Sequence, residues 1–273
     1  MLSVKFGLIG GGVMGEALLS RLLAADVYKS EEIIVSEPAI ARRNFLAEKY
    51  RVNTTADNHQ VFKSVSEVIF LAVKPQVFNQ IAADFAAIGE LQSSPMVVSI
   101  LAGVTLGQLE SAFTNLPVIR AMPNTPATVG AGMTAICGGS KVKPEQLKLA
   151  QQLFTVVGEV VDLPESMMDA VTGLSGSGPA YIAILVEALA DGGVASGLPR
   201  AIANQLALQT VLGTAQLLAE TKLHPAVLKD QVTSPGGTTI AGITALEAGG
   251  FRAAIINAVQ RATLRSRELG EKA

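Results

Sequence analysis

The sequence Gly10-Gly11-Gly12-Val13-Met14-Gly15 lies between an apolar run, Lys5–Ile9, and a helical pattern, Val13–Ala25. Glycines at this spacing between a strand and a helix are typical of a loop that binds a dinucleotide pyrophosphate. The first glycine permits the tight turn, the second lets the backbone approach the phosphates, and the third allows the helix to pack on the strand. A glycine-rich turn without a ligand has the same pattern. We expect a cofactor to bind the backbone of Gly10, Gly11, Gly12, Val13, Met14 and Gly15.

Residues 1–163 alternate short apolar runs with amphipathic stretches. The expected strands are Lys5–Ile9, Glu32–Val35, Val68–Val73, Met96–Ile100, Val118–Met122, Thr134–Cys137 and Val160–Leu163. The expected helices are Val13–Ala25, Ala39–Tyr50, Gln76–Ala87 and Pro144–Val156. Strands separated by helices predict an α/β fold, an N-terminal Rossmann-type domain with a doubly wound parallel sheet. We expect the last strands to complete the sheet edge in mixed orientation.

Residues 164–273 carry long helical patterns instead. Leucine, alanine and valine recur at helical spacing in Ala180–Val194, Pro199–Thr221 and Thr238–Leu269, and Gly249-Gly250 is expected to break the last of these. The pattern predicts an all-helical C-terminal domain of five or six helices. Its apolar residues are spread too evenly for a small bundle that faces water. We therefore expect this domain to form the oligomer interface.

The chain is rich in apolar residues. It has 273 residues, of which 49% are hydrophobic and 16% charged, and its mean hydropathy is +0.41. A membrane-spanning helix needs about 18 consecutive apolar residues, whereas Tyr181–Ala190, the best candidate, is shorter and contains Glu187. Surplus apolar surface in a chain without such a span is buried between subunits. We expect a homo-oligomer without a membrane partner.

Several classes of site and partner are not expected. The single cysteine, Cys137, excludes an internal disulfide, so a cytoplasmic location is expected. The two histidines, His59 and His224, lie far apart, and no metal site is expected. The net charge of −2 without a basic cluster argues against nucleic acid. The first residues enter a strand pattern directly, so no secretory signal is expected.

A second glycine motif, Ser234-Pro235-Gly236-Gly237-Thr238-Thr239, opens the helical pattern that begins at Thr238. The two glycines leave room for backbone N–H groups to face a ligand, and the positive end of the helix dipole favours an anion. An ordinary threonine N-cap is the alternative. Because two adjacent glycines exceed what a cap needs, we expect a carboxylate site, with one threonine hydroxyl free to contact the reacting centre.

The second expected strand leads into Ser36-Glu37, about twenty residues beyond the glycine motif, where Rossmann domains distinguish NAD from NADP. Glu37 favours NAD because a carboxylate accepts from a ribose 2′-hydroxyl and repels a 2′-phosphate. Ser36 with Arg42 and Arg43 favours NADP because they supply donors and positive charge. Both arginines are also compatible with a solvated helix surface. The residues at this position leave the choice of cofactor open.

Three loops follow expected strands and open on the carboxyl edge of the sheet, where ligands of open α/β sheets bind. They are Ala72-Val73-Lys74-Pro75, Ala102-Gly103 and Met122-Pro123-Asn124. An apolar strand leads directly to Lys74, so we expect this lysine to line the site. The prolines on either side of Asn124-Thr125 make that loop rigid, which turn chemistry alone also explains.

The stretch Gly173-Leu174-Ser175-Gly176-Ser177-Gly178 resembles the G-x-x-G-x-G-x-x-x-K element of the β-hydroxyacid dehydrogenases, in which the lysine takes the hydroxyl proton. Here Ile182 stands at the lysine position. Oxidation of an alcohol needs a group that accepts this proton, whereas the carbon of an iminium is already electrophilic. The absent lysine therefore indicates reduction of a C=N bond.

Together these motifs resemble the Δ1-pyrroline-5-carboxylate reductase family over nearly the whole chain. The matching stretches are Gly10–Gly15, Ala72–Pro75, Arg120–Pro126, Gly176–Tyr181 and Asp230–Ile240. Many unrelated enzymes share the Gly10–Gly15 motif, whereas Asp230–Ile240 is the most specific of the five. The resemblance implies an NAD(P)H-dependent oxidoreductase of proline biosynthesis that acts on CH–NH groups. It would reduce 1-pyrroline-5-carboxylate to L-proline by direct hydride transfer. The implied cofactor is NADPH, and NADH in some members.

The resemblance also implies roles for individual residues. Thr239 would be the catalytic residue, contacting the ring nitrogen. The substrate would be bound by Ser234, Gly236, Gly237, Thr238, Thr239, Met122, Pro123 and Asn124. Beyond the glycine loop, the cofactor would be bound by Ser36, Glu37, Asn58, Ala72, Val73, Lys74, Pro75, Ala102 and Gly103. Each active site would combine the nucleotide domain of one subunit with the Ser234–Thr239 loop of its partner, and dimers would assemble into decamers.

Two alternatives stay open at this point. Another imine or hydroxy-acid reductase on the same scaffold would share most of these motifs, although Ile182 weighs against the hydroxy-acid version. A nucleotide-binding regulatory protein would keep the fold without turnover, although it would not need the Ser234–Thr239 loop.

Overall fold

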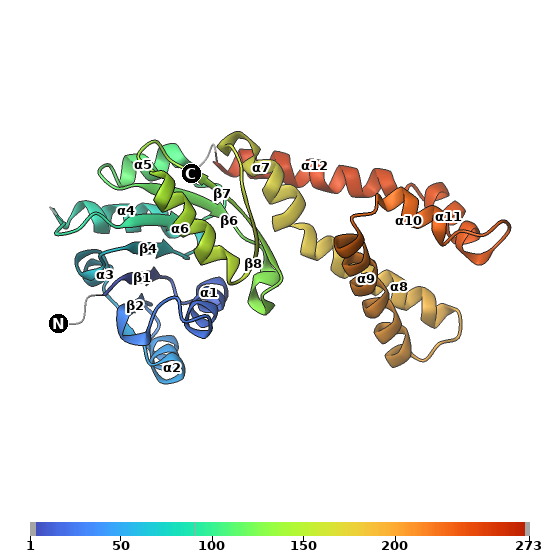
Figure 1. The fold of residues 1–273 in the computed structure, drawn as a ribbon, viewed down its shortest axis with the longest axis horizontal. Helices are drawn as coiled ribbons and strands as arrows, with labels where there is room; N and C mark the ends of the chain where they lie inside the picture. Colours follow the sequence, from blue (N-terminus) through green and yellow to red (C-terminus); the bar gives the residue numbers. More distant parts are fainter. Residues whose placement is uncertain (1–3, 90, 271–273) are drawn as a thin grey trace. The chain divides into compact units, whose positions relative to one another are not determined.

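The computed structural model describes residues 4–89 and 91–270, and Figure 1 shows the fold. Eight strands form one sheet in the order β3-β2-β1-β4-β5-β6-β7-β8. Neighbouring strands are parallel except β6 and β7, which are antiparallel. The predicted doubly wound sheet and its mixed edge are therefore confirmed. The strands are β1 (Phe6–Ile9), β2 (Ile33–Ser36), β3 (Asn53–Thr55), β4 (Val68–Leu71), β5 (Met96–Ser99), β6 (Val118–Met122), β7 (Gly132–Gly138) and β8 (Gly158–Asp162).

Helices cover both faces of the sheet because successive strand residues point to opposite sides. On one face Phe6 and Leu8 of β1 pack in a core with residues of α1 (Val13–Ala24), α2 (Ile40–Tyr50) and α6 (Pro144–Thr155). On the other face Ile9 packs with residues of α3 (Asn58–Ser64), α4 (Phe78–Ala86) and α5 (Leu106–Ala112). The short helical turns are η1 (Ser30–Glu32), η2 (Pro75–Val77), η3 (Thr125–Val129) and η4 (Glu165–Met167).

The sequence pattern missed one strand, β3. Its three residues, Asn53, Thr54 and Thr55, are polar, and it pairs with β2 at the edge of the sheet. An edge strand of this kind has no apolar run to reveal it. The other expected strands are all present, with ends that differ by a few residues.

The C-terminal part is helical, as predicted. Contacts place Ser177–Gln260 in a second compact unit, and the rest of the described chain forms the first. The domain boundary expected after residue 163 stays a prediction, since β8 ends at Asp162 while the contacts divide the chain at Gly176 and Gln260. The helices are α7 (Met168–Val171), the π-helical turn η5 (Thr172–Gly176), α8 (Gly178–Ala195), α9 (Arg200–Thr221), α10 (Pro225–Gln231), α11 (Thr238–Ala248) and α12 (Phe251–Gly270).

The predicted break at Gly249-Gly250 separates α11 from α12. Gly250 has a φ of +71°, which a residue with a Cβ rarely adopts. The two apolar halves of the pattern Thr238–Leu269 therefore form two helices, bent by 50° at the glycines.

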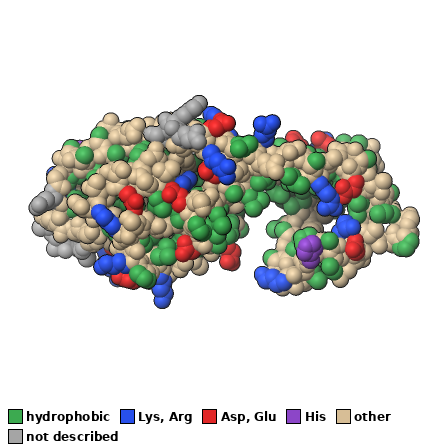
Figure 2. Space-filling view, turned by 90° about the horizontal axis from the view of Figure 1, so that it is seen from above, with side chains coloured by type: hydrophobic (Ala, Val, Ile, Leu, Met, Phe, Trp, Pro, Cys, Tyr) green, Lys and Arg blue, Asp and Glu red, His purple; other side chains and the backbone are tan. Residues whose placement is uncertain are grey.

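The second unit exposes much of its apolar surface. Its buried cluster contains only small side chains, Ala190, Ala203 and Ala207, whereas Ile184 is 65% and Leu208 59% exposed. Figure 2 shows hydrophobic side chains across the surface of this unit, towards the right of the view. Apolar surface of this extent marks an interaction face. Among the described residues, the stretch Glu165–Ala195 and the bent pair α11 and α12 pass a length and composition test for membrane spans, so the expected absence of a membrane partner stays a prediction.

Candidate active site

The glycines of the Gly10–Gly15 loop are required for two different geometric reasons. Gly10 has a φ of +104°, and a Cβ there would lie 2.7 Å from the carbonyl oxygen of Ala72. A Cβ on Gly15 would lie 2.3 Å from the carbonyl oxygen of Gly10, so α1 meets β1 too closely for any larger residue. At Gly12 a Cβ would meet no atom within 4 Å. Gly12 therefore faces open space, where a ligand can approach its backbone.

The start of α1 fits a dinucleotide pyrophosphate. Gly12 is the N-cap residue, and no side chain caps the helix. The N–H groups of the first turn, at Val13 and Met14, have no acceptor within the helix itself. These donors and the helix dipole together favour an anion at this point. The N–H of Gly11, just before the helix, already has an acceptor, because it donates to Oε2 of Glu37 at 3.0 Å.

Glu37 and the two arginines of α2 hold the loop beside the glycines. The other carboxylate oxygen of Glu37, Oε1, accepts from the N–H of Ala39 at 3.0 Å. Nε of Arg42 donates to the carbonyl oxygen of Gly11 at 2.6 Å, and its Nη2 contacts Glu16. Nη1 of Arg43 donates to the carbonyl oxygens of Glu37 and Pro38. Both arginines therefore bind groups of the protein, in contrast to the solvated-surface alternative.

Glu16 on α1 is a strongly bound carboxylate at this end of the site. Burial alone would raise its pKa, but hydrogen bonds from Tyr50, Arg42 and Lys49 outweigh burial and lower the pKa to about 2. Tyr50 donates at 2.7 Å and Lys49 at 3.0 Å. Glu16 is therefore charged at any physiological pH and neutralises Arg42.

A short chain of hydrogen bonds runs from β2 to α4. The hydroxyl of Ser36 donates to Oδ1 of Asn58 at 2.6 Å. Nδ2 of Asn58 donates in turn to Oδ2 of Asp84 at 2.8 Å. Ser36 is buried and Asn58 half-buried. The structure thus brings together Ser36, Glu37 and Asn58 beside the glycine loop, and their contact with an adenosine ribose stays a prediction.

Two further predicted loops follow β4 and β5. Ala72 and Val73 are half-buried, and Lys74 is exposed at the start of η2. Ala102 is exposed, while Gly103 is buried with a φ of +80°. Because both strands are parallel and central, the two loops open on the same sheet edge as the glycine loop. Their contact with a nicotinamide stays a prediction.

The loop after β6 has a structural role that its sequence did not reveal. Nδ2 of Asn124 donates to the carbonyl oxygen of Ser175 at 3.2 Å, and Oδ1 accepts from the N–H of Met133 at 2.8 Å. Asn124 thus ties this loop to β7 and to η5. Pro123 is buried. Met122 lies against Gly176, since a Cβ added to Gly176 would be 2.7 Å from Cε of Met122. Substrate binding by Met122, Pro123 and Asn124 stays a prediction.

The Ser234–Thr239 loop lies in the second unit and forms an uncapped helix start. Gly236 has a φ of +65°, and the N–H of Gly237 donates to the carbonyl oxygen of Ser234 at 3.1 Å. Gly237 is the N-cap residue of α11, and no side chain caps the helix. The threonine N-cap alternative is therefore excluded. Thr239 is half-buried, and its backbone N–H, with that of Thr238, is free for an anion.

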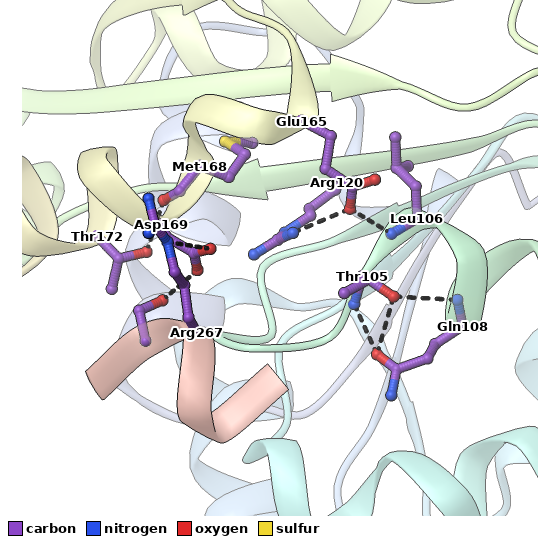
Figure 3. A network of polar contacts seen from close by, with 10 residues as sticks. Thr105, Leu106, Gln108, Arg120, Glu165, Met168, Asp169, Thr172 and Arg267 are labelled. Carbon is purple, nitrogen blue, oxygen red and sulfur yellow. Dashed lines mark hydrogen bonds and ion pairs between the residues drawn. The ribbon is translucent and has the colours of Figure 1, made fainter. Parts of the chain in front are cut away.

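A polar network fixes the chain segment that follows β8 to the sheet (Figure 3). Nη1 of Arg120, on β6, donates to Oε1 of Glu165 at 2.9 Å. Asp169 accepts from the hydroxyl of Ser266 at 2.7 Å and lies 3.7 Å from Nε of Arg267, both on α12. A pocket of about 260 Å³ beside this network is lined by Gly103, Thr105, Arg120, Asp169, Arg267 and Gly270.

Comparison with known proteins decides the family. Residues 165–269 match the model for pyrroline-5-carboxylate reductase dimerisation, and residues 5–103 match the model for NADP oxidoreductase, coenzyme F420-dependent. A pyrroline-5-carboxylate reductase from Synechocystis sp. is 58% identical over 99% of this chain and 100% of its own length. The chain belongs to the pyrroline-5-carboxylate reductase family.

Solved pyrroline-5-carboxylate reductases have the same fold. The enzyme from Coxiella burnetii superposes with a TM-score of 0.90 at 35% identity, covering 98% of both chains. The pyrroline carboxylate reductase from Plasmodium falciparum, solved with NADP bound, superposes with a TM-score of 0.85 at 30% identity, covering 99% of both chains. The predicted family and its class, an NAD(P)-dependent oxidoreductase, are confirmed. The match over 165–269 also supports subunit association through the helical part.

Sequence reasoning missed the charged residues that surround the predicted site. Glu16, Asp84 and Glu165 stand in unremarkable helical or turn sequences, and each acts through a partner that is distant along the chain. No local motif distinguishes them from surface carboxylates. In the described part of the chain, no group of three His, Cys, Asp or Glu side chains is placed to hold a metal.

Proposed function

We propose that this chain reduces 1-pyrroline-5-carboxylate to L-proline with NADPH or NADH. The observation that carries the proposal is the pair of helix starts with glycine at the N-cap, Gly12 of α1 and Gly237 of α11, where no side chain caps the helix. Each offers backbone N–H groups and the positive end of a helix dipole to an anion. The family's reaction involves two anions, the cofactor pyrophosphate and the substrate carboxylate. Each of the two helix starts, which carry partial positive charge, therefore has an anionic ligand to bind.

The Ser234–Thr239 loop binds the substrate carboxylate in this proposal. The glycines leave its backbone uncovered, and the exposed hydroxyl of Ser234 adds a donor beside it. Anchoring the carboxylate at this loop fixes the position of the ring, and so of the imine carbon C5. Orientation of this kind supplies a large part of catalysis in a reaction between two bound molecules.

Thr239 is the residue proposed to act on the reacting centre. When bound, NAD(P)H supplies the hydride, from nicotinamide C4. The substrate reacts as its protonated iminium, so hydride addition at C5 turns the C=N π electrons into the nitrogen lone pair and gives the neutral amine without a further proton. The Thr239 hydroxyl donates a hydrogen bond to this developing lone pair. A hydroxy-acid substrate would require a proton acceptor near Ile182. Ile182 lies on α8 and is 48% exposed, but its side chain cannot accept a proton.

We further propose that two subunits share each active site, with the partner supplying the Ser234–Thr239 loop, and that dimers assemble into decamers. The family resemblance and the exposed apolar side chains of α8 and α9 support this assembly. A cytoplasmic location is proposed from the single cysteine, Cys137, which is buried and free. No nucleic-acid or membrane partner is proposed.

The test is nicotinamide oxidation by the purified full chain with pyrroline-5-carboxylate, run in parallel with NADPH and NADH. Rapid turnover with either cofactor is the expected result. A panel of other cyclic imines and of 2-keto and 3-keto acids, run beside it, identifies a different reductase on this scaffold. Cofactor binding without turnover of any of these compounds would overturn the proposal in favour of a regulatory protein.

A further inference from the structure

The C-terminal end of α12 lies against the Ala102-Gly103 loop, and both belong to the first compact unit. A Cβ added to Gly103 would lie 3.6 Å from the carbonyl carbon of Leu269 and from the backbone nitrogen of Gly270. A Cβ added to Gly270 would lie 3.1 Å from the carbonyl oxygen of Gly103. The last turn of the helix therefore covers Gly103, which is buried although it has no side chain, while Ala102 beside it is exposed.

The tip of this loop has little support of its own. The N–H of Val104 donates to the carbonyl oxygen of Leu101 at 3.3 Å, which closes a tight turn, and Gly103 has a φ of +80°. Leu101 and Val104 are buried, so the core fixes the two ends of the turn. Gly103 itself lines the pocket of about 260 Å³ that Arg120 also lines. Because the tip borders a pocket on that side, its position depends on the helix end that covers it.

A polar contact, rather than apolar burial, holds this end of α12. Within residues 261–270, Ser266 is the one buried residue, and the two leucines, Leu264 and Leu269, are 48% and 47% exposed. The hydroxyl of Ser266 donates to Oδ1 of Asp169 at 2.7 Å (Figure 3). A hydrogen bond to a carboxylate is stronger than one between neutral groups. The Ser266–Asp169 contact is therefore the main attachment of the helix end that these side chains provide.

Asp169 has a rigid support. It follows Met168 on α7, and Met168 is fully buried in the core on one face of the sheet. The carbonyl oxygen of Met168 accepts from the hydroxyl of Thr172 at 2.9 Å. Arg267 is 56% exposed and lies 3.7 Å from Asp169, so this ion pair adds little. A chain of contacts thus runs from the core through Asp169 and Ser266 to the tip of the Ala102-Gly103 loop.

We propose that Ser266 and Asp169 are positioning residues for the nicotinamide half of the cofactor. Their hydrogen bond holds the end of α12 over Gly103 and so fixes the Ala102-Gly103 loop. The inference rests on the proposed function, in which this loop contacts the nicotinamide. Supporting residues of this kind set the geometry of a site without touching the ligand. Loosening the helix end weakens binding of the nicotinamide half and leaves the adenosine half, proposed to bind beside β1 and β2, unaffected.

The test compares the whole cofactor with a fragment that lacks the nicotinamide. Calorimetry without any imine gives dissociation constants for NADPH and 2′,5′-ADP, and for NADH and ADP. In Ser266→Ala the ratio of the cofactor constant to the fragment constant is expected to rise roughly 3- to 10-fold, less than the full effect of a hydrogen bond to a charged group because the loop is only one part of the nicotinamide site. The fragment constant itself is expected to stay unchanged.

Two variants serve as controls. Asp169→Asn keeps an oxygen that accepts from Ser266, and Glu268→Gln removes an exposed carboxylate of the same helix, which pairs with Arg265. Both are expected to keep the ratio within about twofold of the wild type. Asp169→Ala removes the acceptor from a half-buried position and tests the same hydrogen bond should Ser266→Ala not fold. The double variant Ser266→Ala with Asp169→Ala should raise the ratio no further than Ser266→Ala does.

An unchanged ratio in Ser266→Ala and Asp169→Ala would overturn the proposal. Equal weakening of cofactor and fragment would overturn it too, because it would indicate a general loss of stability in the nucleotide-binding unit. Since no imine is present, the expected ratios without imine turnover would contradict the proposed function alone. Rapid imine turnover with an unchanged ratio would contradict the positioning role alone.

Discussion

Arg120 and Glu165 form an ion pair that joins the sheet to the segment after β8. Nη1 of Arg120 donates to Oε1 of Glu165 at 2.9 Å, and the same carboxylate oxygen accepts from the N–H of Leu106 at 2.6 Å. The Arg120 side chain is 8% exposed and that of Glu165 33%. Residues 165–269 match the family's dimerisation region, so this pair anchors the start of that region to the sheet.

Removing Glu165 is expected to be costly because Arg120 would keep its charge in a buried position. We expect Glu165→Ala to lower the free energy of unfolding by about 3 kcal/mol, as measured by urea denaturation. The variant Arg265→Gln breaks an exposed pair with Glu268 and is expected to change stability by less than about 1 kcal/mol. The double variant Arg120→Met with Glu165→Leu is expected to recover most of the loss. Equal losses in the single and double variants would show that the charge pairing is not the cause.

Gly12 and Gly15 are expected to respond to alanine in opposite ways. Gly15→Ala forces a Cβ to within 2.3 Å of a carbonyl oxygen and is expected to cost roughly 3 kcal/mol of stability. Gly12→Ala meets no protein atom within 4 Å, so the fold is expected to tolerate it. Its methyl group faces the proposed pyrophosphate position, and cofactor binding should weaken about tenfold or more. Thermal denaturation and cofactor titration of both variants provide the measurements, and normal cofactor affinity in Gly12→Ala would remove the loop from the binding site.

Thr239 is expected to affect turnover through its hydroxyl. Thr239→Ala should lower kcat roughly 10- to 1000-fold, the loss expected for one well-placed hydrogen bond in the transition state. Thr239→Ser keeps the hydroxyl and should retain most of the activity. Cofactor affinity, measured separately, should be the same in both. Equal turnover in the alanine variant and the wild type would exclude Thr239 from the mechanism.

Glu16 is expected to make the stability of the nucleotide-binding unit sensitive to acid. A carboxyl group whose pKa is lowered on folding stabilises the fold above its ordinary pKa and loses this contribution as the pH falls. For Glu16 this stabilisation is lost as the pH falls from the ordinary pKa of 4.5 to the folded-state pKa of about 2. This contribution is at most about 3 kcal/mol at neutral pH, from about 1.4 kcal/mol per pKa unit, because water screens the exposed part of the carboxylate. Glu16→Gln should lower stability by up to that amount at neutral pH and should flatten the acid limb of the stability curve. Glu48→Gln, which removes an exposed carboxylate on α2, should do neither.

Cys137 is expected to be unreactive in the native protein. It lies on β7 and is 3% exposed, and burial raises the pKa of its thiol to about 12. Because the thiolate is the reactive form, an aromatic disulfide reagent at mildly alkaline pH should not modify the folded chain. Titration in denaturant should then reveal one thiol per chain. Rapid modification of the native protein would contradict the buried position.

The outline of the fold follows from patterns that are local in sequence. The apolar runs, the glycine motif and the break at Gly249-Gly250 each depend on residues close together along the chain, and all of them appear in the structure. The polar edge strand β3 was missed because Asn53–Thr55 is held by pairing with β2 rather than by its own apolar residues. Asn124 was expected to bind substrate on its motif alone. Its two hydrogen bonds, to Ser175 and Met133, depend on contacts that no local pattern contains.

The sequence by itself determined the family, the fold class and the two glycine-rich loops, because glycine spacing and hydrophobic periodicity act over a few turns of chain. Only the tertiary structure decided how the charges are paired. Glu37 accepts a hydrogen bond from the N–H of Gly11. Arg42 forms an ion pair with Glu16, and Arg120 forms one with Glu165. Each pair joins elements that are separate along the chain, and a charged group is donor, acceptor or counter-ion according to its neighbours in space. Ser36 and Glu37 therefore left the choice of cofactor open in the sequence, and the partners of Glu37, the N–H groups of Gly11 and Ala39, are fixed only in the folded chain.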